Sequence, residues 1–130
     1  MKKQFEVLES KKGFLSKKPA SLEEILNCEN KLGVKFADDY KTYLANYGEV
    51  IYYGHELTGI GPIKRLNVVD VTQEMRKFNP KVPREYYVVE ETNIDGIVIW
   101  QNTTGEIFQS YPSGRIIKTF NSLLEYIQSD

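Results

Sequence analysis

Apolar residues recur at helical spacing in the segment that begins at Ser21. Ser21-Leu-Glu-Glu24 has the form of a capping box, in which the Ser21 hydroxyl accepts a hydrogen bond from the Glu24 amide and the Glu24 carboxylate accepts one from the Ser21 amide. The apolar residues behind it fall on one helical stripe: Leu22, Ile25, Leu26, Cys28 and Leu32. Gly33 follows where a left-handed C-cap is expected, so the pattern predicts a helix over residues 21–33.

A second amphipathic helix follows a pair of adjacent acids. Its apolar side has the spacing i, i+3, i+4, i+7, at Tyr40, Tyr43, Leu44 and Tyr47. Asp38 and Asp39 either start this helix or form half of an acid/base or metal site. An acceptor at the N-cap and a negative charge in the first turn each stabilise a helix by roughly 0.5 to 1 kcal/mol. A catalytic pair needs partners of known spacing, which the sequence lacks, so we predict Asp38 at the N-cap and Asp39 in the first turn.

The N-terminal segment and the middle of the chain give weaker patterns. Residues 1–20 are Lys-rich, and we expect a short strand or helix around Phe5, Val7 and Leu8, followed by a loop. The run V-I-Y-Y-G-H-E-L-T-G-I-G-P indicates two short strands, or one strand and a turn. Apolar residues then return to helical spacing behind Asp70, which is the expected N-cap of a third helix.

The last third of the chain predicts an antiparallel meander and a closing helix. Four β-branched or aromatic runs are separated by N-I-D-G, N-T-T-G and P-S-G, and they cover residues 86–90, 97–101, 106–111 and 115–119. The segment I-V-I-W is apolar throughout, which predicts a central strand covered on both faces. Asn121 is the expected cap of a last helix that packs back onto the sheet, with the apolar positions Phe120, Leu123, Leu124 and Ile127.

This order of elements indicates an α+β fold, with an antiparallel-rich twisted sheet packed against several helices. The length fits a single domain over residues 1–130. Residues 1–20 hold six Lys and two Glu, a balance of +4, so the remaining residues stand at −5. An acidic body repels nucleic acid and attracts a basic partner. We interpret the Lys-rich segment as a solvated tail, because only Phe5 and Phe14 are interleaved with its lysines.

Cysteine use and hydropathy indicate a cytoplasmic protein. Cys28 is the only cysteine, which excludes an internal disulfide, and charged residues occupy the place where a signal peptide has its apolar run. No stretch approaches the ~18 consecutive apolar residues of a membrane span. We therefore expect neither export nor a membrane partner.

Candidates for catalysis are few. His55 is the only histidine, lies between Gly54 and Glu56 in an expected turn, and is interpreted as a solvated loop residue. Cys28 lies on an apolar helical stripe and is interpreted as a core residue. Zinc with its usual ligands is excluded by count, and G-I-G-P at residues 59–62 lacks the Lys-Ser/Thr pair of a phosphate loop. We expect no catalytic residue, no metal and no cofactor.

Six segments follow one another in an order that is typical of a known family. They are I-L-N-C-E-N-K-L-G, D-D-Y-K-T-Y-L-A-N-Y-G, V-V-D-V-T-Q-E-M-R-K-F, V-P-R-E-Y-Y-V-V-E-E, G-E-I-F-Q-S-Y and T-F-N-S-L-L-E-Y-I. The chain resembles the SUKH superfamily (SMI/KNR-type) of bacterial immunity proteins, relatives of fungal regulators of cell-wall synthesis, and departs from it at Phe36-Ala37 and Trp100-Gln101. The resemblance implies an α+β domain without enzymatic activity that neutralises a cognate toxin, often a nuclease or deaminase.

A partner-binding surface is predicted where aromatic and acidic residues concentrate, at Tyr52, Tyr53, Glu56, Glu90, Glu91 and Asp95. Exposed tyrosines beside unpaired carboxylates suit a basic toxin domain, such as a nuclease, whose active site is occluded. The alternative is that the tyrosines belong to the core and the acids form a solvated hairpin rim.

Two other functions stay open at this point. One is a regulatory scaffold for a cell-wall or signalling enzyme, and the other is a small hydrolase that uses His55 with a carboxylate. A direct nucleic-acid partner is not expected, and the oligomeric state is not set by the sequence.

Overall fold

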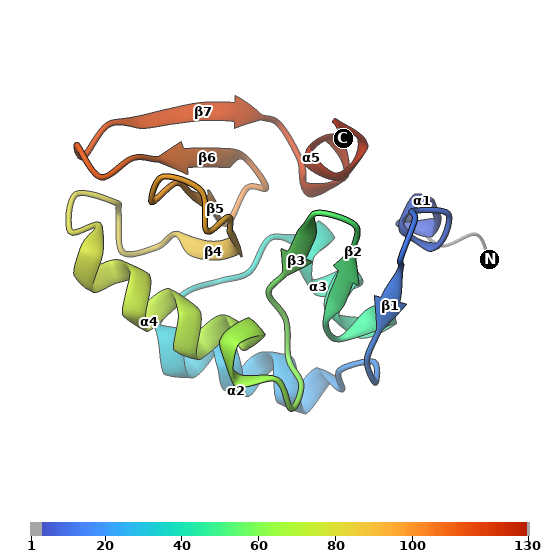
Figure 1. Ribbon diagram of the computed structural model, residues 1–130. Coiled ribbons are helices and arrows are strands. Elements are labelled where there is room, and N and C mark those ends of the chain that lie inside the picture. The colour runs from blue at the N-terminus through green and yellow to red at the C-terminus, as the bar shows by residue number, and fades with distance from the viewer. Residues whose placement is uncertain (1–3, 130) are drawn as a thin grey trace.

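Five α-helices and seven β-strands form the described part of the chain, residues 4–129 of a computed structural model (Figure 1). The helices are α1 (Glu6–Glu9), α2 (Leu22–Leu32), α3 (Asp38–Tyr47), α4 (Val68–Phe78) and α5 (Leu123–Gln128), with a 3₁₀ helix η1 (Lys64–Leu66). The strands are β1 (Leu15–Ser16), β2 (Val50–Tyr52), β3 (His55–Leu57), β4 (Tyr87–Glu91), β5 (Val98–Gln101), β6 (Ile107–Ser110) and β7 (Ile116–Phe120). They form two antiparallel sheets, β1-β2-β3 and β4-β5-β6-β7, which confirms the α+β fold class and the C-terminal meander.

The central strand β5 of the four-stranded sheet is covered on both faces, as its apolar run predicts. Every residue of β5 is buried between β4 and β6. Because alternate side chains face opposite ways, Ile99 joins the core that includes α3, whereas Val98 and Trp100 join a second cluster with Val71 and Met75 of α4. Figure 1 shows α4 below this sheet and α5 beside the end of β7, so the closing helix packs where it is expected.

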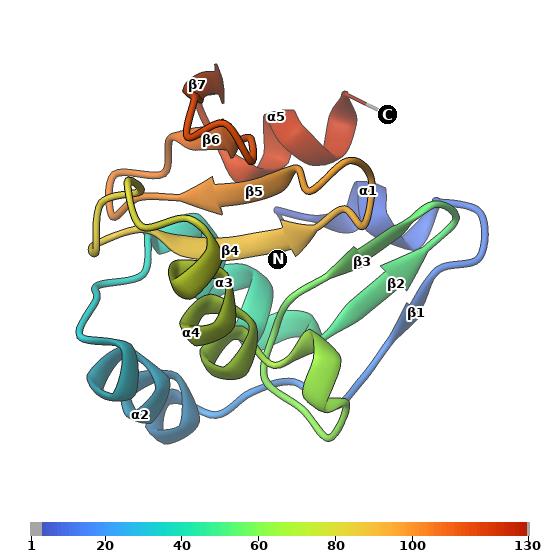
Figure 2. The same ribbon diagram turned by 60° about the vertical axis from the view of Figure 1, so that its left-hand side comes forward.

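The three-stranded sheet lies beside the β4–β5 pair (Figure 2). β2 and β3 form a hairpin with the two-residue turn Tyr53-Gly54, in which Gly54 has a positive φ of 79°. The two short strands are therefore confirmed. β1 pairs with β2, although the sequence pattern predicts a loop there. The prediction misses this strand because it has only two residues, both exposed, and therefore shows no alternation of apolar and polar residues in the sequence.

The N-terminal segment is part of the core, so the interpretation as a solvated tail is wrong over the described residues. Phe5 and Leu8 of the α1 region are fully buried, which confirms a short element here, and the Phe5 ring meets Tyr43 edge-on at 6.2 Å. Lys17 N–H donates to the Glu49 carbonyl at 3.0 Å. Lys2 and Lys3 lie outside the described residues.

The first predicted helix forms with both of its end signals. The Glu24 amide donates to Ser21 Oγ at 3.1 Å, the Ser21 amide donates to Glu24 Oε1 at 2.8 Å, and Gly33 adopts the left-handed conformation. Leu22 and Leu26, which the apolar stripe places in the core, are exposed. α2 lies at the edge of the fold and buries only the side that meets α3 and α4.

The caps predicted for the other helices are displaced along the chain. Asn67, not Asp70, caps α4, and its Oδ1 accepts from the Val69 amide at 3.0 Å. Ser122, not Asn121, caps α5 through the Glu125 amide at 3.1 Å. In each case the residue directly before the first helical residue takes the cap: Asp70 lies inside the first turn of α4, and Asn121 lies one residue before the N-cap of α5.

The helices of residues 4–129 have at most eleven residues, and none is long and apolar enough to cross a membrane.

Asp38 and Asp39 have different roles. The N-cap of α3 is Ala37, which makes no side-chain capping bond, so the prediction for Asp38 is wrong. Asp38 is fully exposed and pairs with Lys41 at 3.7 Å. Asp39 stands in the first turn as predicted, but its carboxylate accepts from Gln101 Nε2 at 2.9 Å and from the Leu123 amide at 2.8 Å. It therefore ties α3 to β5 and to the start of α5.

A close backbone crossing places Glu49 inside the protein. A Cβ on Gly59 would lie 1.8 Å from the carbonyl oxygen of Gly48, so the main chains meet there without side chains between them. Glu49 follows this crossing and is buried, and among residues 4–129 its carboxylate oxygens meet no partner with hydrogen-bond geometry. Burial raises the pKa of Glu49, offset in part by the Ile63 amide and by the charge of Lys17.

We expect Asp39→Asn to lower the free energy of unfolding by about 1 to 3 kcal/mol, because an amide N–H₂ would face one of two donors. Asp38→Asn is the matched control and should cost less than about 1 kcal/mol, since it weakens only an exposed ion pair and the helix macrodipole. Urea unfolding followed by circular dichroism measures both values. Equal losses in the two variants would contradict the role of Asp39.

Glu49→Gln should stabilise the protein increasingly as the pH rises. A carboxyl whose folded pKa is raised contributes stability that is present below its ordinary value of 4.5 and is lost as the pH passes the folded pKa. The neutral amide does not suffer that loss, so we expect a gain of about 1 to 3 kcal/mol at pH 8 and little difference at pH 4. Urea unfolding across this range measures it, with the exposed Glu23→Gln as control, and a pH-independent difference would refute the prediction.

Candidate functional site

An open groove of about 600 Å³ lies between the β2–β3 hairpin, the end of β4 and the loop that contains Lys12 and Gly13. We call it the hairpin groove. Five of the six residues predicted to bind a partner line it: Tyr52, Tyr53, Glu56, Glu90 and Glu91. Asp95 does not line it, since it lies in the β4–β5 connection, exposed and with a positive φ of 53°.

Glu90 forms the inner wall of the hairpin groove, and the expectation that it is a solvated or exposed acid is wrong. Its side chain is buried, with 3% of the residue exposed. The Glu56 amide donates to Oε2 at 2.9 Å, His55 Nδ1 lies 2.9 Å from Oε1, and the Tyr126 hydroxyl donates to Oε1 in a very short contact. One carboxylate thus joins β3, β4 and α5.

His55 is the first residue of β3, so its interpretation as a solvated loop residue is wrong. Its ring stacks on Tyr52 at 4.8 Å and meets Tyr126 edge-on at 6.3 Å. Because a carboxylate only accepts hydrogen bonds, the contact with Glu90 makes Nδ1 the protonated ring nitrogen.

Thr58 makes a second link between the two sheets. Its amide donates to the Val89 carbonyl at 2.8 Å and its hydroxyl donates to the Val88 carbonyl at 2.7 Å. Since that hydroxyl has one proton, Tyr40 Oη donates to it at 2.8 Å, and Tyr43 Oη donates to the Thr58 carbonyl at 2.8 Å. Burial raises the pKa of both tyrosines, which stay neutral donors.

The two neighbouring tyrosines of the hairpin differ in exposure. Tyr52 is buried, so the expectation of an exposed ring is wrong there. Tyr53, at the turn, is 77% exposed, and Lys12 Nζ lies over its ring at 5.7 Å. The Tyr53 amide donates to the Lys12 carbonyl at 2.8 Å, which fixes the turn against the N-terminal loop. Tyr53 is the large aromatic side chain that the groove presents to solvent.

The remaining acids also differ from one another. Glu56 forms an ion pair with Arg65, so it is not the unpaired carboxylate expected. Glu91 is half-buried, and within residues 4–129 its carboxylate has no hydrogen-bond or ion-pair partner. Burial, and then the negative charge of Glu74, raise the pKa of Glu91. Among the acids that line the hairpin groove, Glu91 is the one that is unpaired within the described part of the chain, as the predicted binding surface requires.

Several residues of the groove were missed by sequence reasoning. Lys12, Gly13, Thr92 and Asn93 line it, and Tyr126 reaches its inner wall from the closing helix. Gly13 carries a sequence signal, since a glycine after two lysines marks a turn. Tyr126 carries none, because its position on the helix does not show which strand the helix will meet.

The hairpin groove contains one contact that resembles part of a catalytic site. The His55–Glu90 contact has the form of a general base held by a carboxylate. No Ser or Cys lines the groove, and Cys28 is buried elsewhere on α2, where burial raises its pKa. The part of the chain that the structure describes contains no group of three or more His, Cys, Asp or Glu placed to hold a metal ion.

Comparison with models of protein families places the chain in a family. The model of the family SUKH_5, described as SMI1-KNR4 cell-wall, matches residues 1–129, a range that includes every strand and helix described above. A search of curated proteins found no match to this sequence.

Replacing Glu90 should loosen the hairpin groove. In Glu90→Gln an amide N–H₂ would face one of the donors that now meet a carboxylate oxygen, so we expect a loss of about 1 to 3 kcal/mol in the free energy of unfolding. Glu91→Gln is the adjacent control and should not destabilise, because burial already disfavours its charge. Urea unfolding compares the two, and an undiminished stability of Glu90→Gln would show that Glu90 does not join the sheets.

Proposed function

The chain belongs to the SUKH_5 family, and from this premise we propose that it is an immunity protein that binds a cognate toxin domain and neutralises it by covering the toxin's active site. The observation that carries the proposal is the exposed Tyr53 at the edge of the hairpin groove. Tyrosine is enriched among the residues that dominate binding energy in protein interfaces, because its ring is large and its hydroxyl can hydrogen-bond.

The hairpin supplies Tyr53 in a fixed position. The turn is tied to the Lys12 carbonyl on one side, and β3 is tied through Glu56 and His55 to Glu90 on the other. A side chain on a rigid element loses less conformational entropy when it binds. The groove is therefore suited to hold a partner surface without rearranging first.

The partner we propose is a basic toxin domain, a nuclease or a deaminase. Outside residues 1–20 the chain has a formal charge of −5, which favours association with a domain whose cleft binds nucleic acid. In this proposal the protein acts in the cytoplasm, binds no nucleic acid itself and performs no chemistry. The absence of Ser and Cys from the groove and the three donors around Glu90 support a binding role.

A second candidate is a regulatory scaffold for a cell-wall or signalling enzyme, and the cell-wall description of the matching family favours it. The two candidates predict different partners for the same surface. A neighbouring gene that encodes a long secreted protein with a basic C-terminal domain is expected for an immunity protein, whereas a scaffold needs no such neighbour.

Co-expression with the C-terminal domain encoded by the neighbouring gene tests the proposal. We expect wild-type protein to restore growth of cells that produce that domain and to co-purify with it. Tyr53→Ala should raise the Kd at least about tenfold, because truncating an aromatic residue that anchors an interface removes more than 1 kcal/mol of binding energy. Titration calorimetry measures the change.

Leu22→Ala is the control, since Leu22 is also exposed but lines neither the hairpin groove nor the cavity beside α4. Its Kd should equal that of the wild type. Co-purification without rescue of growth would support the scaffold instead, and equal affinities of the Tyr53 and Leu22 variants would remove Tyr53 from the interface. A purified protein with hydrolase activity that His55→Ala abolishes would contradict both candidates.

A further inference from the structure

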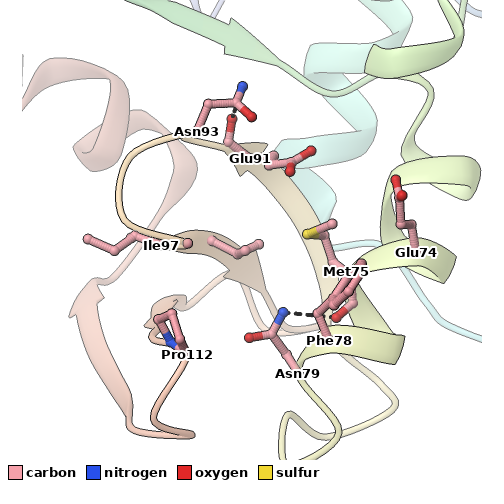
Figure 3. A pocket seen from close by; sticks show the side chains of 10 residues that line it. Glu74, Met75, Phe78, Asn79, Glu91, Asn93, Ile97 and Pro112 are labelled. Atoms are coloured by element: carbon pink, nitrogen blue, oxygen red, sulfur yellow. Dashed lines mark hydrogen bonds between the residues drawn. The ribbon is translucent and has the colours of Figure 1, made fainter.

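A second cavity lies between the C-terminal half of α4 and the loops that follow β4 and β6 (Figure 3). Its volume of about 380 Å³ falls in the range of ligand-binding sites. Most of the side chains that line it are apolar: Met75, Phe78, Ile97, Val98 and Pro112. We call this cavity the α4 cleft. It offers a continuous apolar surface to an aliphatic chain.

Two carboxylates line the same cleft, that of Glu74 on α4 and that of Glu91 at the end of β4. Figure 3 shows both at one end of the cleft, near Met75. Burial, and then the negative charge of Glu74, raise the pKa of Glu91. Glu74 is exposed and Glu91 is half-buried, and over residues 4–129 neither side chain has a hydrogen-bond or ion-pair partner, so a cation placed here would pair with two carboxylates that the fold leaves unpaired.

Phe78 provides aromatic surface at the open side of the cleft. It is the last residue of α4 and is 69% exposed, although it lines both this cleft and a smaller cavity next to it. An aromatic face attracts a cation and also packs against the methylene stem of a long basic side chain. The ring and the two acids therefore favour the same kind of ligand.

The chemistry of the cleft selects among possible occupants. An anion is repelled by Glu74 and Glu91, and a purely apolar group would remove the exposed Glu74 and the half-buried Glu91 from water without pairing them, which is costly. An alkyl chain that ends in a cation satisfies the apolar wall and the acids together. Glu91 and Asn93 line both the α4 cleft and the hairpin groove, so one partner surface can cover both.

We propose that the α4 cleft receives a Lys or Arg side chain of the partner protein, with its stem against Met75 and Phe78 and its cationic head beside Glu74 and Glu91. This inference rests on the proposed function, because it assigns the basic side chain to the partner that covers the hairpin groove. It gives that partner a specific requirement, a long basic residue that protrudes from its surface.

Small probes test the cleft without the partner. The full chain, labelled with nitrogen-15, is titrated at low salt with n-butylammonium and n-propylguanidinium, and with 1-butanol and butyrate as neutral and anionic probes of similar length. We expect the two cations to shift amide resonances of residues 74–79 and 91–98 and to bind about tenfold more tightly than butanol, with butyrate weakest. Equal binding of all four probes, or no shift in these residues, would overturn the inference.

Charge-neutral variants show whether the two acids cause the selectivity. The double variant Glu74→Gln with Glu91→Gln should bind n-butylammonium about tenfold more weakly and no better than butanol. Glu23→Gln removes an exposed carboxylate of α2 that lines no described cavity, and it should bind like the wild type. Loss of cation binding in Glu23→Gln as well would show attraction to net charge and refute a built site.

The partner-dependent step separates this inference from the proposed function. If the wild type binds the toxin domain and the double variant binds it about tenfold more weakly, both are supported. If the wild type binds the toxin domain while the cations fail to bind the cleft, the inference alone is wrong. If the cations bind selectively and no toxin domain is bound, the proposed function is wrong, and so is the assignment of the basic side chain to that partner.

Discussion

The carboxylate of Glu90 ties the β2–β3 hairpin, the larger sheet and the closing helix to one another at a single buried point. The hairpin has three residues in each strand, too little to be stable in water by itself, and it meets the larger sheet along the edge of β4. At that edge Glu90 accepts hydrogen bonds from β3 and from α5. Thr58, two residues after Glu56 along the chain, makes a second hydrogen-bonded contact between the hairpin and β4. The hairpin groove exists because this edge is closed.

Much of the fold is predictable from the sequence because periodicity is a local property. The strands of the meander lie within one residue of the predicted ranges, and the capping box of α2 forms as expected. Caps are less predictable, because two polar residues with capping ability lie within three positions of each other at the start of α4 and of α5, and the structure uses Asn67 and Ser122. The two-residue strand β1 leaves no periodic signal and depends wholly on its pairing with β2.

The candidate site is less predictable because it depends on a register irregularity. Tyr87 and Val89 face the core shared with α3, so strict alternation would send Glu91 toward α5 and Glu90 toward α4. The register shifts between Val88 and Glu90, and an irregularity of this kind reverses the facing of the residues beyond it. Glu90 and Glu91 are adjacent and look alike in the sequence, but Glu90 is buried and joins neighbouring elements, whereas Glu91 lines the groove without a partner among the described residues.

The difference between acids that are hydrogen-bonded within the fold and acids that are unpaired limits what the net charge indicates about a partner. Asp39 and Glu90 accept hydrogen bonds from neighbouring elements, Glu29 accepts one from the Phe36 amide at 2.8 Å, and Glu56 is paired with Arg65. These acids count toward the charge of −5 but are already compensated by donors of the fold. Long-range attraction follows the total charge, whereas the choice of partner follows the acids that remain uncompensated at a cavity. Under the proposed function, recognition therefore depends more on where a partner's basic side chains lie than on how many it carries.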